Sequence, residues 1–279
     1  MPGAAGRPRD LPDFRNPPLV ETVLSLQYEP VGLTAAHVGL LWQRFRDRLP
    51  LVEEHPPLPP VLEKFGRPSP APVELIIQGR PPAPRIWFLN GDKTELVQIQ
   101  PDRFIHNWRK LQGSQAYPRY EPIRDRFREE VGALLEFLEE ERLGSLEVNQ
   151  CEVTYVNHIE PSGVWERHGQ LERVFRYWGA PDASGFLPEA EDGAVRLRFL
   201  IPDQAGKPLG RLYVMWQPAW RKADSAPVLI LNLTARGAPL PEGIEGAFAF
   251  FDLGRRWIVR AFAELTTPEM HQVWGRTNG

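Results

Sequence analysis

The chain has 279 residues, of which 42% are hydrophobic and 25% are charged, and its formal net charge is −3. This composition is typical of a chain that buries a large core, and it excludes a disordered or strongly polybasic protein. The single cysteine, Cys151, excludes a disulfide framework within the chain. Because we find neither the apolar run of a signal peptide nor the roughly 20 apolar residues of a membrane helix, we expect the chain to be cytoplasmic and to make no membrane contact.

The chain begins with a segment that we expect to be flexible, followed by a strand and a helix. Residues 1–16 are polar and rich in Pro and Gly. Between Val20 and Tyr28, apolar and polar residues alternate, which predicts a half-buried strand. Apolar residues at helical spacing then predict a helix that Thr34 caps and Pro50 ends.

Three strands and a long helix complete the first half. After a proline-rich link, the strands are predicted at 74–78, 85–89 and 94–100. The dipeptide Asn90-Gly91 predicts a tight hairpin between the last two strands, because both residues tolerate a positive φ. An apolar stripe from Ile123 to Leu138 predicts a long amphipathic helix with Gly144 at its C-cap.

The second half repeats this order. Its first strand is predicted by an alternating stretch that ends in Glu160-Pro161, and helical spacing from Leu171 to Trp178 predicts a helix. Three strands and a long helix that includes Phe248 follow. The strands are predicted at 194–200, 211–216 and 228–233.

These elements predict an α+β fold with two successive β-α-β-β-β-α halves, at 17–144 and 145–279. We expect mostly antiparallel sheets with helices packed on one face. The first strand of each half ends in Glu-Pro, and the last strand of each half leads to an arginine, Arg103 or Arg236. We interpret the repetition as a diverged duplication. The alternative is coincidence, because strand–helix alternation is common in α+β folds.

Catalytic signatures are missing from the sequence. It contains no nucleophile elbow, no phosphate loop, no dinucleotide fingerprint and no H-E-x-x-H motif. The six histidines are scattered singly, and the six glutamates of 129–141 lie off the apolar stripe, where we expect them to keep the helix soluble. The sequence therefore predicts no catalytic residue, no metal and no cofactor.

The strongest local feature is a basic and aromatic stretch at 102–128. Seven basic residues face three acidic ones there, which gives a local charge of +4. Arginine beside exposed aromatic rings suits phosphate contacts, base stacking or a protein partner. The candidate binding residues are Arg103, His106, Asn107, Trp108, Arg109, Tyr117, Arg119 and Tyr120. The alternative is that the rings pack the core and the arginines pair with carboxylates of the fold.

Three residues form a secondary set of candidates. Asn157 and His158 are a polar pair near the end of a predicted strand, and Arg236 follows another strand. A polar pair that closes an apolar strand can be a site, although such pairs also form hydrogen bonds that only end the strand.

Four segments resemble, in the same order, a sporadically distributed prokaryotic family of uncharacterised proteins with NPPLVE, DRF-x2-NW and YPRY motifs. The segments are NPPLVETVLSLQYEP (16–30), LVQIQPDRFIHNWRK (96–110), YPRYEPIRDRF (117–127) and EVTYVNHIEP (152–161). The resemblance implies no activity, cofactor or catalytic residue. A patchy distribution is typical of defence-associated or mobile genes.

We therefore expect a non-enzymatic interaction protein that binds a protein partner, as an accessory or immunity-type component of a prokaryotic defence or mobile system. One alternative is an RNA- or DNA-binding accessory protein that uses residues 102–128. Another is an enzyme whose site forms only in the fold.

Overall fold

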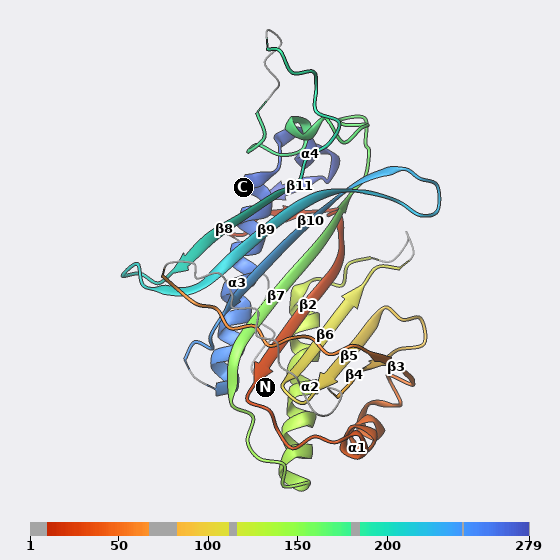
Figure 1. Ribbon diagram of the computed structural model, residues 1–279, viewed down its shortest axis with the longest axis vertical. Helices are drawn as coiled ribbons and strands as arrows, with labels where there is room; N and C mark the ends of the chain where they lie inside the picture. Colours follow the sequence, from red (N-terminus) through yellow and green to blue (C-terminus); the bar gives the residue numbers. More distant parts are fainter. Residues whose placement is uncertain (1–9, 67–82, 112–115, 180–184, 242, 279) are drawn as a thin grey trace.

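The computed structural model describes residues 10–66, 83–111, 116–179, 185–241 and 243–278. Nine antiparallel strands form one sheet in the order β3-β4-β5-β6-β2-β7-β10-β9-β8 (Figure 1). The strands are β2 (Leu19–Tyr28), β3 (Leu51–His55), β4 (Arg85–Leu89), β5 (Glu95–Gln100), β6 (Arg103–Arg109), β7 (Val148–Ile159), β8 (Val195–Pro202), β9 (Pro208–Trp220) and β10 (Pro227–Gly237). A separate two-stranded sheet pairs β1 (Asp13–Phe14) with β11 (Arg276–Asn278).

Helices cover one face of the large sheet, which confirms the predicted α+β class. They are α1 (Ala35–Phe45), α2 (Tyr120–Glu140) and α3 (Gly243–Leu265). The short helix α4 (Pro268–Val273) lies beside β1, where the His271 ring meets Phe14 at 5.5 Å. The two long helices α2 and α3 lie side by side behind the sheet in Figure 1, and Phe127 of α2 meets Phe248 and Phe251 of α3 at ring distances of 6.1 and 5.8 Å. We call the other side of the sheet the open face. Within the described ranges, no helix has both the length and the apolar character needed to cross a membrane.

The strand order is alike on the two sides of the central pair β2 and β7, except that β3 has no counterpart beyond β8. In the first half, β2 lies next to β6, and β6 lies next to β5. In the second half, β7 lies next to β10, and β10 lies next to β9. In both halves the first strand of the half therefore pairs with its last strand. The halves thus share one sheet and one core. A duplication would produce this order, but strand order alone does not test common ancestry, and the duplication stays a prediction.

Several predicted elements differ from the structure. The helix expected from Leu171 to Trp178 is a single 3-10 turn, η1 (Leu171–Arg173), because the chain bends so that Phe175 stacks on Trp216 at 4.4 Å. Strand β3 was not predicted, and the strand predicted at 74–78 lies outside the described residues.

Turns and ends also differ in detail. The predicted hairpin between β4 and β5 is confirmed, with Leu89 opposite Leu96. Its positive φ lies at Lys93 (60°) rather than at Asn90 or Gly91, and the Asn90 side chain accepts a hydrogen bond from the Glu95 amide at 3.0 Å. Helix α2 ends before Gly144, at a C-cap on Glu141. Of the first segment, the structure describes residues 10–16, in which Leu11 and Phe14 are buried.

Candidate binding face

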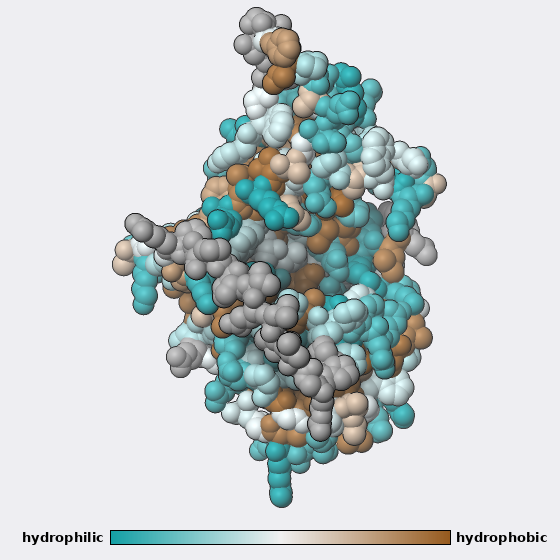
Figure 2. Space-filling model, in the orientation of Figure 1, coloured by the Kyte–Doolittle hydropathy of each residue, from teal (hydrophilic) through white to brown (hydrophobic). Residues whose placement is uncertain are grey.

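An extended segment of the chain crosses the open face. Residues 56–66, which we call the strap, run across the strands on the side that faces the viewer in Figure 1. Figure 2, drawn from the same side, shows hydrophilic and apolar residues mixed over the coloured part of this face. Four of the first five strap residues are proline and have no backbone N–H, so few backbone donors here need partners.

Three glutamines of the sheet accept the strap's backbone N–H groups. The amide of Leu58 donates to Gln100 Oε1 at 3.0 Å, and Gln100 Nε2 donates back to the Leu58 carbonyl at 3.0 Å. The amide of Val61 donates to Oε1 of Gln27 on β2 at 2.7 Å. The amide of Glu63 donates to Oε1 of Gln150 on β7 at 2.6 Å.

A buried carboxylate anchors the far end of the strap. Glu63 has a side chain only 4% exposed, and it forms an ion pair with Arg211. Tyr213 donates a hydrogen bond to the second carboxylate oxygen at 2.6 Å. Charge-assisted bonds to both oxygens offset the desolvation of the carboxylate, so this end of the strap is held by charge.

A chain of polar side chains spans the first half of the open face. Arg85 donates to Gln98 at 2.7 Å, Gln98 to Asn107 at 2.6 Å, and Asn107 to Glu21 at 2.7 Å. Burial raises the pKa of Glu21, while the hydrogen bond from Asn107 and the charge of Arg109 oppose this rise. A cation at one end and a carboxyl at the other orient both amides.

Trp87 lies beside this chain and was not among the predicted site residues. The guanidinium groups of Arg85 and Arg109 lie 5.4 and 5.5 Å from its ring centroid, and the His55 ring stacks on it at 3.7 Å. The alternation of Arg85, Trp87 and Leu89 along one strand was the signal that could have placed Trp87 on this face.

The second half of the open face is a groove rich in arginine, with a volume of about 630 Å³. We call it the arginine groove. Its side chains on the open face are Thr154, Arg196, Arg198, Tyr213, Met215, Asn232, Thr234 and Arg236. The hydroxyls of Thr154 and Thr234 lie 2.8 Å apart on its floor, and Arg236 donates to Glu152 at 2.7 Å.

The predicted candidates do not form one site. Arg103, Asn107, Arg109 and Arg236 lie on the open face, and Arg103 donates to the Pro59 carbonyl of the strap at 2.9 Å. His158 is exposed near the end of β7, where it lines a separate surface hollow with Lys110 and Arg221.

Three candidates are buried in the core instead: His106 and Trp108 lie on β6, and Tyr120 is the first residue of α2. His106, Trp108 and Tyr120 are 1%, 4% and 3% exposed, so the expectation of exposed aromatic rings is wrong for Trp108 and Tyr120. His106 Nδ1 lies 2.8 Å from a carboxylate oxygen of Glu130, which is itself buried. The prediction that Glu130 only keeps the helix soluble is therefore wrong.

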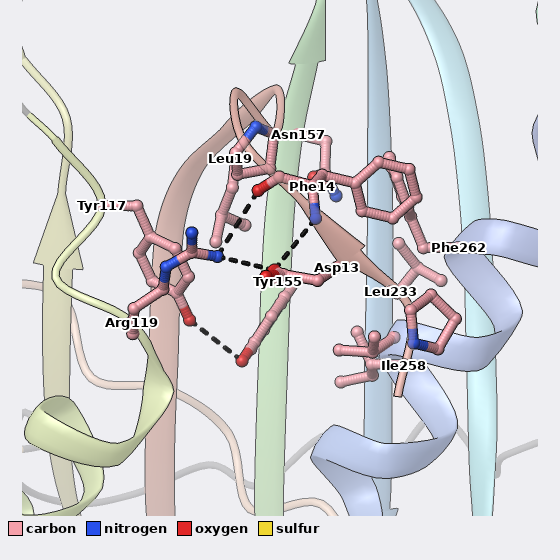
Figure 3. Close-up of a pocket in the computed structure, with 13 residues that line it drawn as sticks. Asp13, Phe14, Leu19, Tyr117, Arg119, Tyr155, Asn157, Leu233, Ile258 and Phe262 are labelled. Carbon is pink, nitrogen blue, oxygen red and sulfur yellow. Dashed lines mark hydrogen bonds and ion pairs between the residues drawn. The ribbon is translucent and has the colours of Figure 1, made fainter. Parts of the chain in front are cut away.

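The remaining candidates, Tyr117, Arg119 and Asn157, line a small apolar pocket of about 50 Å³ (Figure 3). The hydroxyls of Tyr117 and Tyr155 lie 3.2 Å apart, and burial raises the pKa of both phenols. Arg119 has a positive φ of 79° and donates to Asp13 at 2.9 Å, which ties the N-terminal segment to the start of α2. Phe14 and Phe262 also line this pocket, with their ring centroids 5.3 Å apart.

The arginines of the basic stretch are mostly paired. Arg124 lies 2.9 Å from Asp252, Arg126 lies 3.1 Å from Glu129, and Arg128 pairs with Glu245. Three carboxylates of α2 and α3 that lie outside the stretch therefore offset most of its local charge of +4.

Over the described ranges, no group of three or more His, Cys, Asp or Glu side chains is arranged to hold a metal ion.

Comparison of the sequence with protein-family models and with curated proteins finds no match. The resemblance to the prokaryotic family therefore stays a prediction.

Proposed function

We propose that the chain is a non-enzymatic interaction protein that holds an extended segment of a protein partner on the open face of its sheet. The observation that carries this proposal is the strap. The open face already binds one extended segment through side chains from five strands. They are Gln100 of β5, Arg103 of β6, Gln27 of β2, Gln150 of β7 and Tyr213 of β9. Backbone bonds of this kind supply affinity for an extended chain, while pockets beside them supply selectivity.

The arginine groove is the place on this face for a partner segment. It lies beside the end of the strap, because Tyr213 both lines the groove and binds Glu63. An accessory or immunity-type role in a prokaryotic defence or mobile system remains part of the proposal, on the resemblance alone.

The nucleic-acid alternative loses its main support. It depended on exposed aromatic rings and unpaired arginines at 102–128, whereas Trp108 and Tyr120 are buried and Arg124 and Arg128 pair with carboxylates of α3. The enzymatic alternative stays a prediction.

Co-purification from the native host tests the proposal. The partner should purify with the tagged chain, and Thr234→Arg, which fills the groove floor, should remove it. Glu139→Arg places the same side chain on the exposed side of α2 and should leave the partner bound. Equal recovery of the partner with both variants would contradict a site on the open face.

A further inference from the structure

The open face contains a fourth amide oxygen that resembles the three used by the strap. Asn232 lies on β10, and its Oδ1 atom is buried without a hydrogen-bond partner in the portion of the chain that the structure describes. It lies in the arginine groove, opposite Met215 of β9. A buried acceptor without a donor costs free energy, so the Asn232 amide gains a bond that the free protein lacks when it turns about its Cβ–Cγ bond and presents this oxygen to a ligand N–H in the groove.

The same groove has cations without carboxylates. Arg196 and Arg198 project from β8 at exposed positions, and neither has an ion pair within the described ranges. The other two arginines of this region do have partners: Arg211 pairs with Glu63 and Arg236 with Glu152. Arg196 and Arg198 are therefore the charges available to a ligand.

The two arginines have the spacing of an extended peptide. Residues i and i+2 of a strand point to the same side and are about 7 Å apart, which is also the spacing of alternate side chains in an extended ligand. Arg198 lies opposite Tyr213 in the ladder, and Arg196 lies opposite Met215. An extended segment beside β8 can thus bring acidic side chains at i and i+2 to both arginines.

From these observations we infer that the arginine groove selects an acidic, extended segment of the partner protein. Carboxylates at alternate positions bind Arg196 and Arg198, and one backbone N–H of the segment donates to Asn232 Oδ1. Glu63 of the strap is the internal example, because its N–H binds an amide oxygen while its carboxylate binds Arg211. A nucleic acid would supply phosphates for the arginines, but its phosphodiester backbone has no N–H for Asn232. The inference rests on the proposed function.

The test measures fluorescence anisotropy of labelled probes on the full chain at about 50 mM salt, where screening is weak. The main probe is a peptide of alternating Glu and Ala, compared with a peptide of alternating Gln and Ala and with a single-stranded oligothymidylate. We expect the Glu–Ala peptide to bind about tenfold more tightly than the Gln–Ala peptide, which corresponds to about 1.4 kcal/mol shared between two exposed charge-assisted pairs.

Variants locate the binding. Arg196→Ala and Arg198→Ala change exposed residues, and each should weaken the Glu–Ala peptide several-fold, as should Asn232→Ala, while Arg126→Ala on the exposed side of α2 should not. Circular dichroism checks that every variant is folded.

Three outcomes would overturn the inference. They are equal affinity for the two peptides, an equal loss with Arg126→Ala, or oligothymidylate binding that depends on Arg196 and Arg198 as strongly as the acidic peptide does. If Thr234→Arg still removes the partner during co-purification while the acidic peptide fails to bind, the open face remains the binding site and only its acidic selectivity is wrong.

Discussion

Single residues on the core face explain why part of the basic and aromatic stretch is structural. His106 faces α2 rather than solvent. The carboxylate of Glu130 on α2 contacts the His106 ring nitrogen and forms an ion pair with Arg48. Arg48 also reaches Glu95 at 3.2 Å. A buried carboxylate with two partners joins α2 to the sheet and to the end of α1, and its removal leaves those partners without their acceptor.

Glu130→Ala tests this arrangement. We expect the variant to lose about 3 kcal/mol of the free energy of unfolding, because it leaves His106 buried and unpaired. Glu129→Ala makes the same change one residue away at an exposed position, where the lost pair with Arg126 should cost less than about 0.5 kcal/mol. Urea denaturation measures both. Equal losses would show that Glu130 has no special role.

His271 makes stability depend on pH. Its Nε2 lies 2.9 Å from Thr266 Oγ1, and its Nδ1 lies 3.1 Å from Arg276 Nη1. The Thr266 hydroxyl donates to the Phe262 carbonyl, so Nε2 is the donor to Thr266 and Nδ1 accepts from Arg276. Burial, and after it the charges of Arg276 and Arg176, lower the pKa of His271, while Glu269 opposes the shift.

A lowered pKa means that the unfolded chain binds the proton more readily than the folded one. The stabilisation is therefore complete above the ordinary histidine pKa of about 6.5 and is lost as the pH falls through the folded-state value. We expect the free energy of unfolding to decrease between about pH 7 and pH 5, and to decrease less in His271→Gln. Denaturation curves across this range measure both slopes, and identical slopes would contradict this assignment.

Among the elements, the strap is held to the sheet along its length, and its one charged anchor is at Glu63. Leu58 and Val61 donate backbone bonds to Gln100 and Gln27, whereas Glu63 binds through both its N–H, to Gln150, and its carboxylate, to Arg211. Glu63→Gln keeps the shape of this side chain and removes its charge, so the strap should open more often. Trypsin should then cleave after Lys64 faster than in the native chain, as mass spectrometry of the fragments measures.

Glu54→Gln is the matched control, because it removes an exposed carboxylate from β3. Its cleavage after Lys64 should follow that of the native chain. If Glu63→Gln is cleaved no faster than this control, the carboxylate does not hold the strap.

Helix α3 fits the sheet through a glycine pair. Gly210 and Gly237 lie opposite each other on β9 and β10, and Phe250 fills the space above them. A Cβ on Gly237 would lie 2.3 Å from the Phe250 ring and 2.4 Å from the Leu209 carbonyl oxygen. Gly237 therefore sets how closely α3 approaches these strands.

Gly237→Ala should destabilise the fold by about 2 kcal/mol or more through overpacking. Gly132→Ala in α2 meets no atom within 4 Å and should instead stabilise it by about 0.5–1 kcal/mol, because alanine favours the helix. Thermal denaturation of both variants measures whether each substitution lowers or raises the stability of the fold. A neutral Gly237→Ala would mean that α3 can move away from the sheet at no cost.

For the whole molecule, alternation and helical spacing were enough to predict the α+β class, the strands β2, β7 and β8, and the helices α2 and α3. They failed for β6, because its alternate residues carry polar side chains whose partners are remote in sequence. Arg103 binds the strap, and His106 faces Glu130. The pattern of apolar and polar residues along one segment does not indicate partners that lie far away in the sequence.

The candidate site was predictable only in pieces. Arg236 and Asn107 were found, but the strap crosses the strands, so no periodicity along the chain links Gln27, Gln100 and Gln150. Arg196 and Arg198 appeared as the polar side of a strand. Only the order of strands in the sheet brings them beside Asn232.

Site-specific photocrosslinking in the native host tests the central claim most directly. A benzophenone amino acid replaces Met215 in the arginine groove or, in a parallel strain, Glu139 on the exposed side of α2. We predict a discrete protein adduct at position 215, absent at 139, that a Thr234→Arg background removes. Adducts of equal yield at both positions, or nucleic acid as the species crosslinked at 215, would contradict a protein-binding open face.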